Sequence, residues 1–153
     1  MAPSPSVFLA AAIQRTHHIR LGPLVYLLPL YHPLRLVQEI CMLDNMSRGR
    51  LEVGIGRGVS PYELAFYNLT PQEARAMFRE ALDILMAGLT PGEVSYAGEY
   101  FSFKNVRLHI APCWKTSPAR NWVSTRNTPS RWSNVCSRAS ARGPTTTRCS
   151  GHC

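Results

Sequence analysis

Long apolar segments are missing from the sequence. Two apolar stretches, residues 7–13 and 24–30, are far shorter than the roughly 20 residues that a membrane-spanning helix needs, and Pro29 interrupts the second. The N-terminus also lacks the basic region that opens a secretory signal peptide. We therefore expect a soluble, cytoplasmic protein without a membrane partner.

Cysteines at metal-binding spacing are missing too. The chain has five cysteines, and the last four, Cys113, Cys136, Cys149 and Cys153, are separated by 23, 13 and 4 residues. These intervals match no zinc-binding framework. A disulfide scaffold is not expected in a chain without a secretion signal. We predict that the protein binds no metal ion and that the cysteines share no role.

Acidic residues are absent from the C-terminal part of the chain. Residues 1–112 contain ten Lys or Arg and nine Asp or Glu, whereas residues 113–153 contain seven basic residues and no acid. Periodicity also ends after Pro112, and a Ser-, Thr- and Arg-rich segment without an apolar stripe cannot offset the entropy cost of ordering. We predict a folded region, 1–112, and a disordered basic tail, 113–153.

The abrupt change at this boundary motivates the hypothesis that residues 113–153 are translated in a shifted reading frame. The hypothesis requires that another frame of the gene restores an apolar β/α pattern after Pro112. A splice error or an authentic tail are the alternatives. An authentic basic tail with three interleaved tryptophans would suit single-stranded nucleic acid, but we assign the protein no nucleic-acid partner.

Helical and strand-like patterns alternate along residues 6–88, which predicts parallel strands. Pro23 predicts an irregularity in the first strand, because proline cannot donate to a strand ladder. Thr70 to Glu73 form a capping box that starts the last helix. The expected elements are helix 6–17, strand 19–30, helix 33–46, strand 50–58, helix 70–88 and an antiparallel hairpin in 93–110 with a turn at Gly98.

A glycine-rich strand end, Gly54-Ile55-Gly56-Arg57-Gly58, is the strongest candidate for a binding site. It matches neither G-x-G-x-x-G nor the P-loop, so the two common phosphate motifs fail. Ligands of β/α proteins nevertheless bind at the carboxyl ends of strands. Arg57 and Arg75, together with the start of the helix that carries Arg75, would form a phosphate site. The alternative is that both arginines are solvated and the glycines only turn a corner.

Three sequence pieces occur in register: Leu28-Pro29-x-x-His32-Pro33, Leu43-Asp44-x-x-Ser47-x-Gly49-Arg50 and Gly54-x-x-Arg57-Gly58. Arg75 follows at the expected distance. With these pieces, about residues 6–112 resemble the luciferase-like monooxygenase family, which includes the α subunit of bacterial luciferase. The resemblance implies an α/β fold, a partial (β/α)8 TIM barrel with about two barrel strands, flanking helices and a small hairpin.

The resemblance also implies a cofactor and its contacts. Family members use reduced flavin, FMN or, in one branch, the deazaflavin F420, and most FMN members activate O2 to oxidise an organic substrate. The flavin phosphate maps onto Arg57, the backbone of Val59, and Arg75. Leu24 and Val25 map beside the isoalloxazine ring, at a bulge where members carry a non-proline cis peptide.

Other polar residues of the matching pieces receive structural interpretations. His32 either borders the flavin pocket or makes a structural contact at a helix start. Asp44, Ser47 and Arg50 are interpreted as local hydrogen-bonding and capping groups. The catalytic histidine of luciferase-type members lies on an earlier strand, so we expect no catalytic residue in this chain.

These expectations lead to one function and two alternatives. We expect a fragment of a flavin-dependent monooxygenase that is inactive alone, because a complete barrel has eight strands in about 250 residues. The first alternative is a non-catalytic partner that docks helix 33–46 on a full-length homologue, as a homo- or heterodimer. The second is a fragment of an F420-dependent oxidoreductase. The nearly all-apolar surface of helix 33–46 fits either a subunit contact or a buried core.

Overall fold

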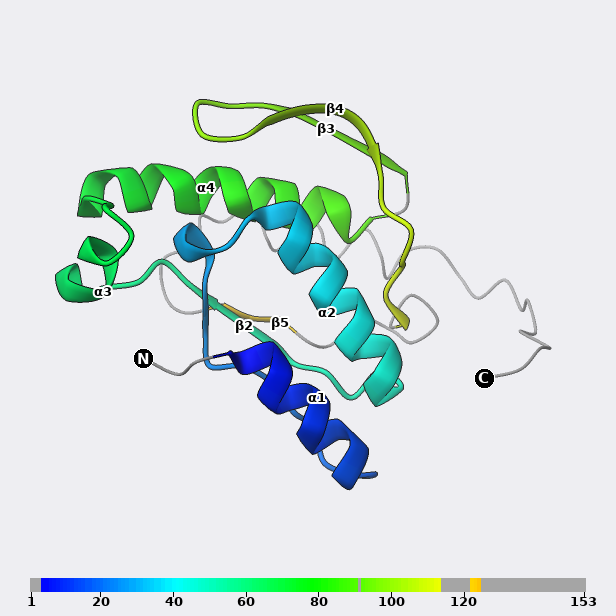
Figure 1. Cartoon of the computed structure of the whole chain (residues 1–153). Coiled ribbons are helices and arrows are strands. Elements are labelled where there is room, and N and C mark those ends of the chain that lie inside the picture. Colours follow the sequence, from blue (N-terminus) through cyan, green and yellow to red (C-terminus); the bar gives the residue numbers. More distant parts are fainter. Residues whose placement is uncertain (1–3, 91, 114–121, 125–153) are drawn as a thin grey trace.

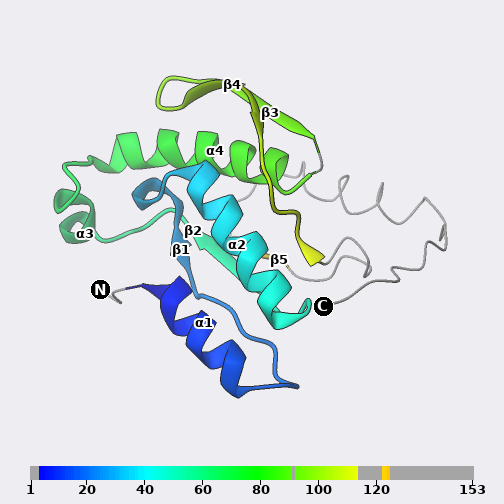
Figure 2. The same ribbon diagram turned by 45° about the vertical axis from the view of Figure 1, so that its right-hand side comes forward.

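The computed structural model of the protein describes residues 4–90, 92–113 and 122–124. Helices pack against a small parallel sheet, and a hairpin lies over the longest helix (Figures 1 and 2). The elements are α1 (Pro5–Arg15), β1 (Tyr26–Leu27), the 3-10 helix η1 (Leu28–Leu30), α2 (Pro33–Ser47), β2 (Val53–Gly56), α3 (Pro61–Ala65), α4 (Pro71–Gly88), β3 (Glu93–Ala97), β4 (Ser102–Arg107) and β5 (Trp122–Ser124).

The parallel sheet has the order β1-β2-β5. Tyr26 pairs with Ile55 between β1 and β2, and Val53 pairs with Trp122 between β2 and β5. The alternation of helices with parallel strands confirms the predicted fold class. The short strand β5 adds a third member to the sheet after residue 112, whereas the predicted division of the chain at that residue stays a prediction. Residues 114–121 and 125–153 of the predicted tail lie outside the described part of the chain.

The predicted strand 19–30 is interrupted in its middle. Leu21 forms an isolated parallel bridge with Leu51, and the Pro23 carbonyl accepts a hydrogen bond from the Gly54 N–H at 3.2 Å. The regular strand β1 starts only at Tyr26 and passes after two residues into η1. The irregularity predicted from proline is therefore confirmed, but the strand ends earlier than predicted.

The helix α2 is largely a core helix. Helices α1 and α4 both pack along it (Figure 2), and α4 approaches so closely that a Cβ atom on Gly88 would lie 2.9 Å from Val37 Cγ2. Met42 and Met46 remain exposed, at 53% and 37%. Most of its apolar surface is therefore used within the chain, and a subunit contact through this helix stays a prediction. Its buried apolar residues are Pro33, Leu36, Val37, Ile40, Cys41 and Leu43.

The helix α4 has the predicted start and the predicted end. Thr70 Oγ1 accepts a hydrogen bond from the Glu73 N–H at 3.3 Å, and the Glu73 carboxylate accepts one from the Thr70 N–H at 2.8 Å. The capping box is thereby confirmed.

Within the described residues, no helix combines the length and the apolar character needed to cross a bilayer.

The predicted hairpin is present as β3 and β4, and Glu80 of α4 holds its turn. The Glu80 carboxylate accepts hydrogen bonds from the N–H groups of Glu99, Tyr100 and Phe101, at 2.8, 3.1 and 3.1 Å. The approach is so close that a Cβ atom on Gly98 would lie 2.3 Å from Glu80 Oε2. A side chain at position 98 would therefore have to displace the Glu80 carboxylate that holds the turn.

Candidate functional site

The candidate site lies where the carboxyl end of β2 meets the N-terminal end of α4. Figures 1 and 2 show both ends on the same side of the molecule, close to α3. Arg57 directly follows β2, and Arg75 lies in the second turn of α4. Among the described residues, neither guanidinium has an acidic partner, whereas Arg20 and Arg35 each pair with a glutamate. Two cations at one end of the fold thus remain available for an anion, and the N-terminal end of α4 adds a partial positive charge.

The glycines of this strand end serve two different purposes. A Cβ atom on Gly54 would lie 2.5 Å from the Pro23 carbonyl oxygen, and one on Gly56 would lie 2.6 Å from Val25 Cγ2. The preceding strand segment therefore fills the space beside these two glycines. Their lack of a side chain is explained by packing between the strands. Gly58 differs, because its φ of +84° turns the chain beyond β2 and a Cβ atom there would have nothing closer than 3.8 Å.

The segment after this turn contains a helix that the sequence analysis treated as loop. Ser60 caps α3 by accepting a hydrogen bond from the Glu63 N–H at 3.4 Å. The pattern Ser60-Pro61-x-Glu63 repeats the Thr-Pro-x-Glu start of α4 and was the signal that would have predicted it. Val59, at the entrance to α3, is 86% exposed. This residue thus lies on the surface, two positions after Arg57.

The predicted cis peptide bond is present between Leu24 and Val25. The Leu24 side chain is 83% exposed and lies over the backbone of Gly54, and Val25 lies against both Gly54 and Gly56. The cis bond is thereby confirmed, whereas contact of these two residues with a flavin ring stays a prediction.

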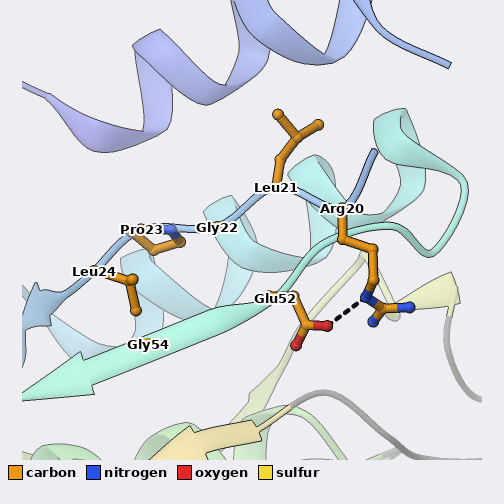
Figure 3. A pocket seen from close by; sticks show the side chains of 7 residues that line it. All are labelled: Arg20, Leu21, Gly22, Pro23, Leu24, Glu52 and Gly54. Atoms are coloured by element: carbon orange, nitrogen blue, oxygen red, sulfur yellow. Dashed lines mark hydrogen bonds and ion pairs between the residues drawn. The ribbon is translucent and has the colours of Figure 1, made fainter. Parts of the chain in front are cut away.

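A pocket of about 260 Å³ opens beside Leu24 (Figure 3). The side chains of Arg20 and Glu52 form an ion pair at its far end, marked by the dashed line. The lining of the pocket is therefore apolar at the Leu24 end and charged at the end formed by Arg20 and Glu52. Its lining residues are Arg20, Leu21, Gly22, Pro23, Leu24, Glu52 and Gly54.

The polar residues of the other matching pieces have structural contacts. His32 precedes α2 and packs edge-on against Phe101, with ring centroids 5.7 Å apart. This contact supports the structural interpretation of His32 and not the one that places it at the flavin pocket. Ser47 donates from its hydroxyl to the Asp44 carbonyl at 3.0 Å. Within the described residues, no group of three or more His, Cys, Asp or Glu side chains is arranged to hold a metal ion.

Arg50 connects the C-terminal ends of two helices. Its guanidinium donates to the carbonyl of Ser47 at 2.9 Å, of Thr16 at 2.9 Å and of Ile19 at 2.8 Å. Carbonyls at helix C-termini lack partners within the helix and carry partial negative charge, which suits a cation. The predicted local hydrogen-bonding role is therefore confirmed for Ser47, whereas Arg50 combines a local bond to Ser47 with bonds to residues more than 30 positions earlier.

Fold and site together define a segment of a β/α barrel with cations at the carboxyl end of a strand. The sequence profile of the family described as luciferase-like monooxygenase matches residues 1–127. The chain belongs to the luciferase-like monooxygenase family. The match extends beyond the predicted boundary at residue 112 and includes β5.

Individual relatives agree with this assignment. An uncharacterized protein of Sinorhizobium fredii is 46% identical over 132 residues, covering 86% of this chain and 38% of the relative. The crystal structure of the monooxygenase RslO1 from Streptomyces bottropensis superposes with a TM-score of 0.74 at 32% identity, covering 80% of this chain and 37% of that one.

A third relative was solved with its cofactor. The oxygenating constituent of 3,6-diketocamphane monooxygenase from Pseudomonas putida, in complex with FMN, has a TM-score of 0.63 at 28% identity. The match covers 69% of this chain and 30% of that one. The chain thus spans between 30% and 38% of the length of these three relatives.

Proposed function

We propose that the chain contributes the phosphate-binding end of a flavin site to a monooxygenase. The observation that carries the proposal is the pair of arginines without acidic partners, Arg57 and Arg75, at the same end of β2 and α4. A phosphate monoester carries up to two negative charges, and guanidinium groups bind such groups with two parallel hydrogen bonds. The family membership supports a flavin cofactor as the ligand that carries this phosphate group.

The remaining contacts follow from the arrangement around these two residues. The turn at Gly58 is followed by the exposed residue Val59, whose N–H group would donate to a phosphate oxygen beside Arg57. Leu24 and Val25 would lie beside the ring system, because Leu24 is an exposed apolar side chain beside Gly54 and Val25 follows it across the cis bond. Bound reduced flavin would supply the activation of O2 for oxidation of an organic substrate. These residues bind and orient the cofactor, and none of them serves as an acid or a base.

FMN is the cofactor we propose, with F420 as the alternative within the family. FMN is the ligand in the solved relative of 28% identity. We further propose that the protein works in the cytoplasm and that the chain alone does not turn over substrate. This second point follows from the three parallel strands of the described part, since a barrel site draws on eight.

Titration of the full chain with reduced and oxidised FMN, followed by flavin fluorescence, tests the proposal. Arg57→Gln and Arg75→Gln should each weaken binding by about tenfold or more, because each removes a charge-assisted contact worth about 1.5–3 kcal/mol. Arg79→Gln is the matched control, since Arg79 lies one turn further along α4 and also has no acidic partner among the described residues. Equal losses in all three variants would contradict a site at Arg57 and Arg75.

The same titration separates the alternatives. Preference for F420 over FMN would indicate the second cofactor. Binding that appears only after addition of an intact homologue would identify the chain as an assembly partner. Absence of saturable binding under both conditions would overturn the proposed site.

A further inference from the structure

The turn at Gly58 is supported from one side by two leucine side chains. A Cβ atom on Gly58 would lie 3.8 Å from Leu64 Cδ2 and 3.9 Å from Leu27 Cδ1, which is ordinary van der Waals contact. Leu27 belongs to β1 and also lies beside Gly56, 3.6 Å from a Cβ atom there. Leu64 belongs to α3. The strand β1 and the helix α3 therefore meet behind this turn.

Leu64 attaches α3 to the rest of the fold. Of the five residues of α3, Leu64 is the buried one, at 3% exposed. Its N–H donates to the Ser60 carbonyl at 3.2 Å, and its carbonyl accepts a hydrogen bond from the Leu69 N–H at 3.0 Å. Figure 1 shows α3 between the end of β2 and the start of α4. Leu64 thus connects the segment that carries Arg57 to the helix that carries Arg75.

We propose that Leu64 is the positioning residue of the phosphate-binding loop, residues 57–59. The inference rests on the proposed function, because it concerns how that loop is held. A helix of five residues is not stable by itself in water, so its packing keeps it in place. Without the leucine side chain, the turn at Gly58 loses one of its two apolar supports. Arg57 and the Val59 N–H then have to be ordered by the phosphate itself, and this ordering reduces the affinity.

The ratio of the affinities for FMN and riboflavin measures this effect, because riboflavin has the same ring system and lacks the phosphate. Titration of the full chain with each flavin, followed by fluorescence, gives the ratio. The unchanged chain should prefer FMN, and Leu64→Ala should reduce the preference by about fivefold or more. Riboflavin affinity should stay the same, because the proposed ring contacts, Leu24 and Val25, belong to another segment. Leu64→Met should restore the preference, since methionine fills a similar volume.

Leu89→Ala is the matched control. Leu89 is also buried, at 6% exposed, and follows α4 at the end opposite to Arg75. Its replacement removes the same atoms from the interior without touching the loop. It should lower the melting temperature and leave the ratio unchanged. A thermal melt checks that each variant is folded in the assay, and Leu64→Val with Leu89→Val replaces the pair if either alanine variant is not.

Two results would overturn the positioning role. In the first, Leu64→Ala keeps the FMN preference of the unchanged chain. In the second, Leu89→Ala reduces the preference equally, which indicates general destabilisation.

Arg57→Gln distinguishes failure of this inference from failure of the proposed function. If Arg57→Gln lowers the FMN preference and Leu64→Ala does not, the phosphate site stands and the positioning role is wrong. If the unchanged chain does not prefer FMN, or Arg57→Gln leaves the preference intact, the phosphate site is wrong and the positioning role falls with it.

Discussion

Replacement of Glu80 by alanine should release the β3–β4 turn from α4. The carboxylate accepts three backbone N–H groups, two of them in partly buried surroundings. Hydrogen bonds to a charged acceptor contribute about 1.5–3 kcal/mol each when buried, and less where water screens them. For two partly buried bonds and one exposed bond, we expect a loss of about 2–4 kcal/mol.

The loss should be local, because all three hydrogen bonds end at consecutive amides of this turn. A loss of this size raises the population of the open turn by about thirtyfold to several hundredfold. Hydrogen exchange at the amides of Glu99, Tyr100 and Phe101 should accelerate by the same factor. Glu80→Gln should show an intermediate effect, since an amide keeps one acceptor oxygen and directs an NH2 group at the donors.

Asp83→Ala is the matched control for this experiment. Asp83 is an exposed acid in the same helix and has no hydrogen bond or ion pair with the described residues. It should leave exchange at the turn unchanged. The reasoning is refuted if Glu80→Ala accelerates exchange at these three amides no more than Asp83→Ala does.

Two further predictions concern pH. Burial raises the pKa of Tyr26 from 10.0 to about 12, although its hydrogen bond with Ser6 at 2.9 Å acts in the opposite direction. The stabilisation that follows from this raised pKa is complete below pH 10 and is lost as the pH rises toward 12. The free energy of unfolding, measured with urea, should therefore decline by about 2–3 kcal/mol over this range, and Tyr26→Phe should abolish the decline. An equal decline in the variant would contradict this. Hydrogen bonds from Thr70 lower the pKa of Glu73 below its usual 4.5. The ionised Glu73 carboxylate therefore stabilises the fold above pH 4.5, and this stabilisation is lost on acidification. Thr70→Ala should therefore destabilise the protein at neutral pH, by about 1 kcal/mol through the lost N-cap, and the difference from the unchanged chain in thermal melts should shrink on acidification rather than stay constant.

Local sequence determined the elements whose causes are local. The capping box at Thr70 and Glu73 satisfies backbone donors within one turn, so it was visible in four consecutive residues. The apolar stripe of α4 and the alternation in the hairpin were visible for the same reason. The repeated pattern at Ser60 was equally local, and α3 was missed only because five residues are too few to show a period.

The candidate site was predictable in part. The pieces that resemble the family fixed the positions of Arg57 and Arg75, and they also predicted the cis bond after Leu24. They did not reveal what fills the space beside Gly54 and Gly56. That space is occupied by a segment about 30 residues earlier in the chain, so its occupant is decided by strand pairing and not by neighbouring residues.

The sequence by itself determined the β/α alternation, the ends of α4 and the family, because each depends on short-range patterns or on motifs in register. Tertiary structure alone decided three other features. It placed α2 between α1 and α4, it made Arg50 the link between two helix ends, and it added β5 to the sheet. Each of these joins residues far apart in the chain, and the free energy that selects them exists only once the sheet and the helices have packed together.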